Sequence, residues 1–275
     1  MNSDRQRSID HNRGLATPVA AVHAAFAPVG PLVRWLRRPR HRHTLLPIVL
    51  GVAIASLLFP FDGLLGGAIN GLDERNEAGK RLLGGDVIRE LSALGQFGGL
   101  SSVVLAGVAV YLLDPARRRA LWNLAAAAGS TSIAVLLCKA VIGRPRPKFD
   151  EPSLILGPFA AYPLGPGEGV HHAWEVWAGI SSDLWSMPSS HTSGATALAV
   201  FLALTYPRLR WLVVSWVAVV AFSRVLFGAH WPSDVVLGAA VGYAVSHAAV
   251  TQGWGTRLAT RVGLLGAGAP EPGRA

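Results

Sequence analysis

Three short groups of charged and polar residues interrupt the apolar stretches of this 275-residue chain, and they contain the residues that could do chemistry. They lie at residues 139–147, 188–191 and 223–234. Ionisable side chains at membrane depth are costly to keep, so within an apolar sequence they indicate a functional site. The competing interpretation is that these residues simply end helices at the membrane–water interface.

The group at 223–234 contains Arg224, His230 and Asp234 in that order. Pro232 is excluded from a helix interior, so we expect His230 in a turn and Asp234 at the start of the next helix. From there the carboxylate can reach back to one ring nitrogen of His230, fix its tautomer and support a developing imidazolium. The other ring nitrogen is then free to act as a nucleophile.

The group at 139–147 is a short basic strip. Lys139 belongs to the end of an apolar helix that Gly143 can terminate, and the prolines that follow favour an extended exit carrying Arg144 and Arg146. Two interpretations stand side by side. The long basic side chains could contact lipid head groups, or they could bind the phosphate of a substrate.

The group at 188–191 begins another apolar stretch. Ser189 is a good N-cap, which leaves Ser190 and His191 in the first helical turn. A helix N-terminus offers free backbone N–H groups and the positive end of the helix dipole, so it suits an anion. Plain capping would explain the serines, but it does not explain His191.

Together these groups supply two histidines, one carboxylate and several fixed cations. Phosphoryl transfer needs this inventory, because arginine side chains and backbone N–H groups stabilise the charge on phosphoryl oxygens without a metal. A second histidine can protonate the leaving oxygen near neutral pH. A metal site is disfavoured because the arginines would repel a cation, and we expect no cofactor.

The composition indicates a membrane protein. Hydrophobic residues make up 51% of the chain and charged residues only 15%, whereas soluble domains carry about 25% charged residues. The formal charge of +9 is concentrated in residues 1–43, which hold eight arginines and two aspartates. Such a tail could bind nucleic acid, but before an apolar stretch it is more typical of a cytoplasmic membrane flank. The single cysteine, Cys138, excludes an internal disulfide.

Six apolar segments are predicted to cross the membrane as helices. They lie at residues 44–61, 94–113, 120–142, 189–206, 211–228 and 233–250. The basic residues of the termini and of the connections after the second and fourth segments fall on one side, which the positive-inside rule assigns to the cytoplasm. The three polar groups fall on the other side. The alternative is a soluble helical protein, and the length and uniformity of the segments argue against it.

The predicted organisation is a basic, largely disordered cytoplasmic tail over residues 1–43, a six-span domain over residues 44–250 and a cytoplasmic C-terminal tail over residues 251–275. Residues 62–93 are expected to form an aqueous loop with room for a short helix, and residues 143–188 a long loop. Three tryptophans of the long loop are expected at the membrane interface: Trp174, Trp177 and Trp185.

Taken in order, the three groups resemble the signature of the type-2 phosphatidic-acid phosphatase superfamily, the integral-membrane lipid phosphate phosphatases. The matching patterns are Lys-x6-Arg-Pro from Lys139, Pro-Ser-x-His from Pro188 and Ser-Arg-x5-His-x3-Asp from Ser223. The resemblance covers residues 44–250 when the six segments are included. It implies an all-α integral membrane bundle that works without a metal.

The resemblance also implies a role for each matched residue. It assigns the phosphate to fixed cations and to the start of the second motif: Lys139, Arg146, Arg224, Ser189 and Ser190. His230 is implied as the nucleophile that forms a phosphohistidine, Asp234 as its orienting partner and His191 as the acid for the leaving group. Arg144 lies outside the matched motif and could bind a second phosphate or the head-group region. The family usually has glycine where this chain has Ser190, which predicts a modified pocket.

We therefore expect an enzyme that hydrolyses a lipid phosphate or diphosphate at the outer face of a prokaryotic cytoplasmic membrane, with no nucleic-acid partner. The substrates left open are phosphatidic acid, phosphatidylglycerol phosphate, an isoprenyl diphosphate and a phosphorylated glycolipid. Two alternatives remain. One is a phosphotransferase that passes the phosphoryl group to an alcohol, and the other is a non-enzymatic lipid-binding or scaffolding protein. The oligomeric state is left open.

Overall fold

The computed structural model of the chain describes residues 39–73, 82–165, 167 and 169–266. The chain divides into two compact units, residues 1–42 and 43–275. Apart from the first residues of one helix, the elements below belong to the second unit. The predicted N-terminal tail lies outside the described residues up to residue 38.

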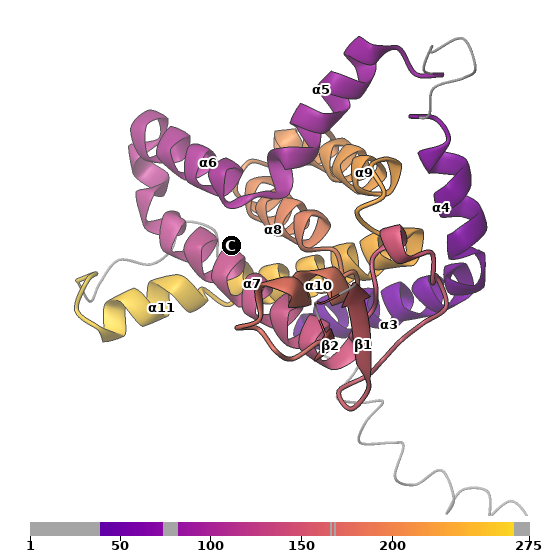
Figure 1. Cartoon of the computed structure of the whole chain (residues 1–275). Helices are drawn as coiled ribbons and strands as arrows, with labels where there is room; N and C mark the ends of the chain where they lie inside the picture. Colours follow the sequence, from indigo (N-terminus) through magenta and orange to yellow (C-terminus); the bar gives the residue numbers. More distant parts are fainter. Residues whose placement is uncertain (1–38, 74–81, 166, 168, 267–275) are drawn as a thin grey trace, which may run out of the picture. The chain divides into compact units, whose positions relative to one another are not determined.

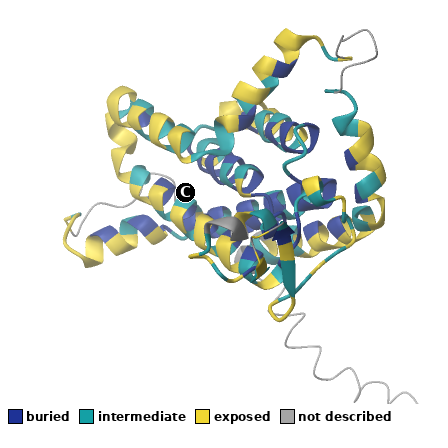
Figure 2. Cartoon of the chain, viewed as in Figure 1, coloured by how far each residue is buried: buried dark blue, intermediate teal, exposed yellow. Residues whose placement is uncertain are grey.

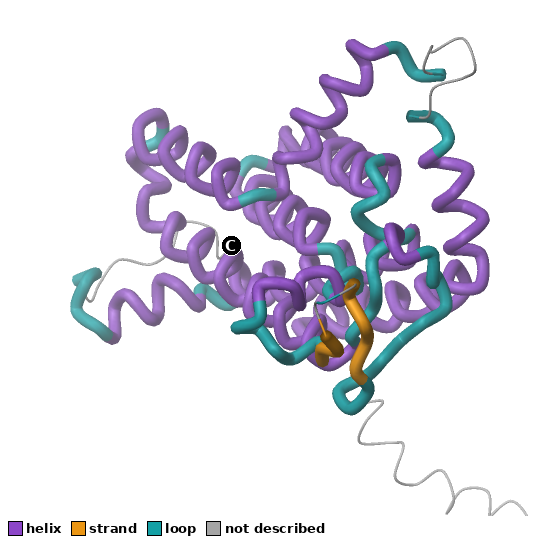
Figure 3. The backbone as a smooth tube through the Cα atoms, viewed as in Figure 1, coloured by secondary structure: helices purple, strands orange, loops and turns teal. Residues whose placement is uncertain are grey.

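The described part of the second unit is mostly helical (Figures 1 and 3). Its longer helices are α3 (Pro39–Leu58), α4 (Asp62–Asn70), α5 (Gly85–Gly95), α6 (Leu100–Leu113), α7 (Leu121–Ile142), α8 (Ser190–Thr205), α9 (Arg210–Leu226), α10 (Pro232–Thr251) and α11 (Trp254–Arg261). Short 3₁₀ turns join several of them, including η3 (Gln96–Gly98) between α5 and α6. A hairpin of two strands, β1 (Ala161–Gly165) and β2 (Gly169–His172), lies between α7 and α8.

Four helical stretches of the described residues are apolar and long enough to cross a bilayer: 44–70, 115–142, 207–226 and 232–251. The pair α5 and α6, bent by 72° at its junction, makes a fifth if it counts as one span. Large apolar side chains such as Leu105 and Leu137 are exposed on these helices, as expected of surfaces that face lipid. Much of the outer surface of the helices is exposed (Figure 2). The chain is an integral membrane protein.

The prediction of six spans is confirmed only in part. Four of the predicted segments correspond to α3, α7, α9 and α10. The segment predicted at 94–113 is α6, preceded by a sharp bend. The segment predicted at 189–206 is α8, whose 16 residues fall short of the roughly 20 that a spanning helix needs.

Residues 62–70 continue the first apolar helix and do not form the aqueous loop that we expected. Helix α4 follows α3 after one 3₁₀ turn, and its first residue, Asp62, is fully buried. The expectation failed because residue type alone does not separate Asp62 from the acidic residues that follow it. What keeps Asp62 buried is its contact with buried groups much farther along the chain, which are Arg144 and Ser233.

Helices α8 and α10 approach each other so closely that only glycine fits at the contact. A Cβ atom at Gly242 would lie 2.6 Å from the carbonyl oxygen of Ser193, and one at Gly238 would lie 2.7 Å from that of Ser189. Both helices carry many of the buried residues (Figure 2). This contact holds the start of α8 beside the start of α10, where the second and third polar groups lie.

The segment between α7 and α8, residues 143–189, is folded on itself; we call it the α7–α8 segment. Strands β1 and β2 pair antiparallel, with Ala161 opposite His172. A small core packs within the segment, formed by Leu164, Ala173 and Leu184. The long loop expected from the sequence therefore has a fixed structure.

The residues after α10 form α11 and are not a simple tail. Gly255 packs against the carbonyl oxygen of Trp122 at the start of α7. The side-chain oxygen of Asn123 accepts a hydrogen bond from the N–H of Thr256 at 3.0 Å. The predicted C-terminal tail is thus helical over residues 254–261, and residues 267–275 lie outside the described residues.

The contact between α8 and α10 predicts opposite effects for two glycine-to-alanine substitutions. Gly242→Ala places a methyl group against Ser193 and should lower the free energy of unfolding by about 1–3 kcal/mol. Gly129→Ala in α7 adds a Cβ with no neighbouring atom within 4 Å, so it should be neutral or stabilise by up to about 1 kcal/mol. Thermal unfolding in one detergent measures both, and equal stability of the two variants would contradict the close packing.

Candidate active site

His230 lies in the turn between α9 and α10, as predicted, and is only 3% exposed. Its Nδ1 is 2.7 Å from the carbonyl oxygen of Ser186. A carbonyl oxygen only accepts, so Nδ1 carries the proton and Nε2 keeps its lone pair. Burial lowers the pKa of His230, and Lys139 and Arg146 lower it further, whereas Asp234 opposes them. A neutral ring with Nε2 unprotonated is the form that a nucleophile requires.

Asp234 contacts His230 less directly than the sequence predicts. Its Oδ2 is 3.8 Å from Nδ1 of His230, whose hydrogen bond goes to Ser186 instead. The carboxylate accepts hydrogen bonds from the N–H of Trp231 at 2.9 Å and from the hydroxyl of Ser186 at 2.5 Å. Asp234 therefore fixes the residue next to His230 and the residue whose carbonyl orients the ring. It positions His230 through the backbone.

Arg144 is fully buried, which contradicts the idea that it could bind a second phosphate or the head-group region. Its Nη1 donates to Asp234 Oδ1 at 2.6 Å and to the hydroxyl of Ser233 at 2.7 Å. Its Nη2 donates to Asp62 Oδ2 at 2.7 Å and to the carbonyl oxygen of Pro152. The idea was wrong because two buried carboxylates, from α4 and α10, engage this guanidinium. Arg144 is a structural cation.

Lys139 and Arg146 bind the main chain around His230. Lys139 Nζ, on the last turn of α7, donates to the carbonyl oxygen of Trp185. Arg146 Nη1 donates to the carbonyl oxygen of Ala229 at 3.0 Å. Gly143, with φ of +59°, ends α7 as predicted and turns the chain toward these contacts. Both cations are close enough to His230 to interact with it electrostatically.

Arg224 lies in the last turn of α9 and is only 9% exposed. Its backbone carbonyl accepts hydrogen bonds from the N–H of Ala229 at 3.0 Å and of His230 at 3.2 Å, which closes the turn that carries the histidine. Its side-chain Nε is buried and donates no hydrogen bond to any residue that the structure describes. A buried donor without a partner is costly, so this position suits an anionic ligand.

The start of α8 supplies Ser189 and Ser190. Ser189 is the N-cap, because its Oγ accepts from the N–H of Thr192 at 3.4 Å, and its own N–H donates to the carbonyl oxygen of Asp234 at 3.1 Å. Ser190 is exposed at the first helical position, where its N–H and that of His191 have no acceptor within the helix. These two N–H groups are therefore available to an anion, whereas that of Ser189 is already engaged.

His191 is half-buried and faces the other predicted residues. The groups close enough to interact with it electrostatically are Arg224, His230, Arg146 and Lys139. The bend between α5 and α6 comes directly against this cluster. A Cβ atom at Gly98 would overlap the carbonyl oxygen of His191, and one at Gly95 would overlap the side chain of Arg224.

Three residues of the site were not predicted: Asp62, Trp185 and Ser186. Asp62 pairs with Arg144, and the other two act through their main-chain carbonyls. A carboxylate directly after an apolar stretch was a signal for Asp62, whereas a carbonyl contact leaves no signal in residue type. Trp185 was expected at the membrane interface, yet its Nε1 donates within the α7–α8 segment to the carbonyl oxygen of Ala173 at 2.6 Å.

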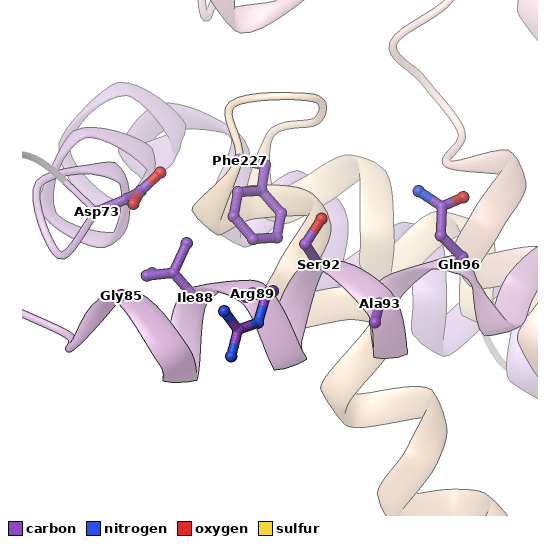
Figure 4. A pocket seen from close by; sticks show the side chains of 8 residues that line it. All are labelled: Asp73, Gly85, Ile88, Arg89, Ser92, Ala93, Gln96 and Phe227. Atoms are coloured by element: carbon purple, nitrogen blue, oxygen red, sulfur yellow. The ribbon is translucent and has the colours of Figure 1, made fainter.

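A groove of about 610 Å³ lies along one face of α5 (Figure 4). Asp73 and Phe227 line its other wall, and none of the predicted site residues lines it.

Among the described residues, no three histidine, cysteine, aspartate or glutamate side chains come together as a metal-binding group. The chemistry that the cluster offers is thus a neutral ring nitrogen beside several cations and free N–H groups, which suits a phosphate.

A model of the PAP2 superfamily matches residues 120–257, which include all three polar groups. The match covers half of the chain, and the chain belongs to this superfamily. The relationship indicated by the three sequence motifs is therefore confirmed.

Individual relatives match over shorter stretches. Lipid A 1-phosphatase of Rhizobium johnstonii is 32% identical over 106 residues, 38% of this chain and 36% of the relative. An undecaprenyl-diphosphatase of Sulfolobus acidocaldarius is 37% identical over 67 residues, 24% of this chain and 32% of the relative. The chain thus spans about a third of the length of these curated relatives.

The fold is similar to that of a solved membrane protein. The crystal structure of a transmembrane PAP2-type phosphatidylglycerolphosphate phosphatase from Bacillus subtilis aligns with a TM-score of 0.50 at 17% identity. The alignment covers 78% of this chain and 97% of that protein. The likeness at this level of identity is one of fold.

The burial of Arg144 predicts a large effect on stability. Arg144→Gln leaves Asp62 and Asp234 buried without a counter-charge and should lower the free energy of unfolding by about 3–5 kcal/mol. Lys148→Gln is the matched control. Lys148 pairs with Asp183 at 2.6 Å but is 55% exposed, so its loss should cost less than about 1 kcal/mol. Thermal unfolding compares the two, and similar melting temperatures would show that the buried pairing is not formed.

Proposed function

We propose that this protein is a membrane-embedded phosphatase that hydrolyses a lipid phosphate or diphosphate through a phosphohistidine, without a metal ion. The observation that carries the proposal is the setting of His230, whose Nδ1 is bonded to the Ser186 carbonyl while cations lie within electrostatic reach. A neutral, oriented imidazole beside fixed cations suits attack on a phosphate. Membership of the PAP2 superfamily and the matches to lipid phosphatases support the same reaction.

In the first step, Nε2 of His230 attacks the phosphorus atom and the bond between phosphorus and the leaving oxygen breaks. The phosphoryl oxygens are held by Lys139, Arg146 and Arg224 and by the N–H group of Ser190. The negative charge of the bound phosphate offsets the surrounding cations, so His191 carries a proton in the complex. It gives this proton to the leaving oxygen, and the lipid departs as an alcohol, or as a monophosphate when the substrate is a diphosphate.

In the second step, the phosphohistidine is hydrolysed. Neutral His191 takes a proton from water, the water oxygen attacks phosphorus and the phosphorus–nitrogen bond breaks. Inorganic phosphate forms and Nε2 of His230 regains its lone pair. The Nδ1 proton stays in its hydrogen bond to Ser186, and Asp234 holds the surrounding backbone in place.

The proposed substrate class follows from what the relatives have in common. The similar proteins are a lipid A 1-phosphatase, an undecaprenyl-diphosphatase and, by fold, a phosphatidylglycerolphosphate phosphatase. These names share a phosphate carried by a membrane lipid. We therefore assign this chain a lipid of the same class, which covers phosphatidic acid, phosphatidylglycerol phosphate, isoprenyl diphosphates and phosphorylated glycolipids.

The proposed topology has six spans, with both termini in the cytoplasm of a prokaryote and the site at the outer face. Helix α8 is the fourth span. It packs against α7, α9 and α10, so a helix shorter than the bilayer is shielded there from lipid. The arginines of residues 117–119 precede α7, whereas Lys139 lies at its end, which puts the basic connection and the site on opposite sides.

The mechanism predicts that His230→Ala lowers phosphate release by on the order of 10³-fold or more, because the nucleophile is lost. His247→Ala is the matched control. His247 lies in the last turns of α10, stacked on Tyr243, so this variant should keep wild-type activity. The measurement is inorganic phosphate released by purified protein from a panel of lipid phosphates, with a chelator present. Activity that survives in His230→Ala, or wild-type activity that the chelator abolishes, would contradict the mechanism.

The topology predicts which positions an impermeant thiol reagent can reach in intact cells. In a Cys138→Ala background, Phe159→Cys should be labelled from outside, because Phe159 is 91% exposed in the α7–α8 segment. Arg118→Cys, exposed between α6 and α7, should be labelled only after lysis. The reverse pattern would invert the proposed topology.

A further inference from the structure

Asp62, the first residue of α4, is a fully buried carboxylate that belongs to none of the three motifs. Its Oδ1 accepts a hydrogen bond from the N–H of Ser233 at 2.9 Å. Its Oδ2 accepts from the hydroxyl of Ser233 and from Nη2 of Arg144, the latter at 2.7 Å. A carboxylate with three such donors, one of them a buried cation, is held firmly in place.

The partners of Asp62 lead to the turn that carries His230. Ser233 is the second residue of α10 and directly precedes Asp234. Arg144 bridges the two carboxylates, because its Nη2 donates to Asp62 while its Nη1 donates to Asp234 at 2.6 Å. The start of α10 is therefore anchored to α4 twice, once through the serine and once through the guanidinium.

The same contacts determine the net charge of the buried group next to His230, which consists of Asp62, Arg144 and Asp234. Two carboxylates and one guanidinium carry a net charge of −1, which favours a cation nearby. The charged and titratable groups that face His230 are Asp234 from α10, Lys139 from α7, Arg146 from the α7–α8 segment, His191 from α8 and Arg224 from α9, whose carbonyl closes the turn. Among these, Asp234 is the carboxylate. The electrostatic effect of Asp234 on His230 depends on Arg144, because this guanidinium is hydrogen-bonded to both Asp234 and Asp62.

We propose that Asp62 is a positioning residue for the reaction, which acts through Arg144 and Ser233 on Asp234 and thereby on His230. This inference rests on the proposed phosphatase function. The hydrogen bonds of Asp62 go neither to His230 nor to a cation assigned to phosphate binding. Its effect therefore belongs to the chemical step and not to substrate binding.

Asp62→Asn tests this assignment, because it keeps the size of the side chain and removes the charge. We expect kcat to fall by about 10- to 100-fold, as for a small misplacement of a reacting group, and KM to change by less than about twofold. Asp86→Asn is the matched control, since Asp86 is 89% exposed and pairs with Arg89, and it should leave both constants unchanged. Phosphate release over a range of substrate concentrations gives both, and a wild-type kcat in Asp62→Asn would overturn the proposal.

The pH profile distinguishes positioning from a merely structural role. The attacking ring must be neutral, so the acid limb of kcat/KM reports the pKa of His230 in the free enzyme. Removing a negative charge disfavours the imidazolium, so Asp62→Asn should lower this pKa and move the limb to lower pH. Asp62→Glu keeps the charge and should leave the limb in place even if kcat falls. A limb that stays at the wild-type pH in Asp62→Asn would contradict the assignment.

Thermal unfolding tests the same contacts without a substrate. Asp62→Asn and Arg144→Gln should each lower Tm, and the double variant should lose less than their sum, because Asp62→Asn removes one of the carboxylates that Arg144→Gln leaves unpaired. Additive losses would overturn the coupling. If the wild type releases no phosphate, the proposed function fails by itself, and the double-variant cycle still decides whether Asp62 and Arg144 act together.

Discussion

The buried guanidinium of Arg144 is the interaction on which the assembly of the site depends. It lies between the carboxylates of Asp62 and Asp234, and all three side chains are fully buried. None of the three can stay buried and charged without the others, because an unpaired ion in a low-dielectric interior is strongly disfavoured. The first helical stretch, the exit of α7 and the start of α10 must therefore come together as one unit.

His230 depends on this unit through main-chain groups. Arg144 donates a hydrogen bond to Asp234, and Asp234 accepts one from the hydroxyl of Ser186. The main-chain carbonyl oxygen of Ser186 in turn orients the imidazole of His230. The preceding carbonyl, that of Trp185, accepts from Lys139. Two adjacent carbonyls of one segment thus hold His230 and Lys139. Their spacing is limited by the planar peptide unit, which leaves two soft dihedrals per residue.

The motifs located the candidate site residues by type, but they did not reveal the contacts that hold these residues in place. His191, His230 and the matched cations are close to one another as predicted, because their chemistry marks them within an apolar sequence. Arg144 and Arg146 are the same residue type two positions apart, and the buried pairing with Asp62 and Asp234 makes Arg144 structural. Carbonyl contacts such as that of Ser186 depend on the path of the chain and leave no mark in residue type.

The helices show the same limit. Hydropathy located α3, α7, α9 and α10, since each is one long apolar run. It did not reveal the bend before α6, which lies against residues that are distant in sequence. At Gly95 and Gly98 the backbone presses against Arg224 and His191, and no local pattern of apolar residues reports that neighbour. The length of α8 was likewise missed, because an inner helix that its neighbours shield from lipid can be shorter than the bilayer.

Ser190 can now be understood where the family usually has glycine. Glycine is required where another backbone comes too close for a Cβ atom, and around this helix start the close approaches fall on Gly98 and Gly238. Ser190 itself is exposed at the first position of α8, so its side chain takes no space from a neighbouring backbone. Its N–H is kept, and its hydroxyl adds a donor at the positive end of the helix dipole. The substitution therefore changes the donors at the start of α8 while the packing of the helix start is preserved.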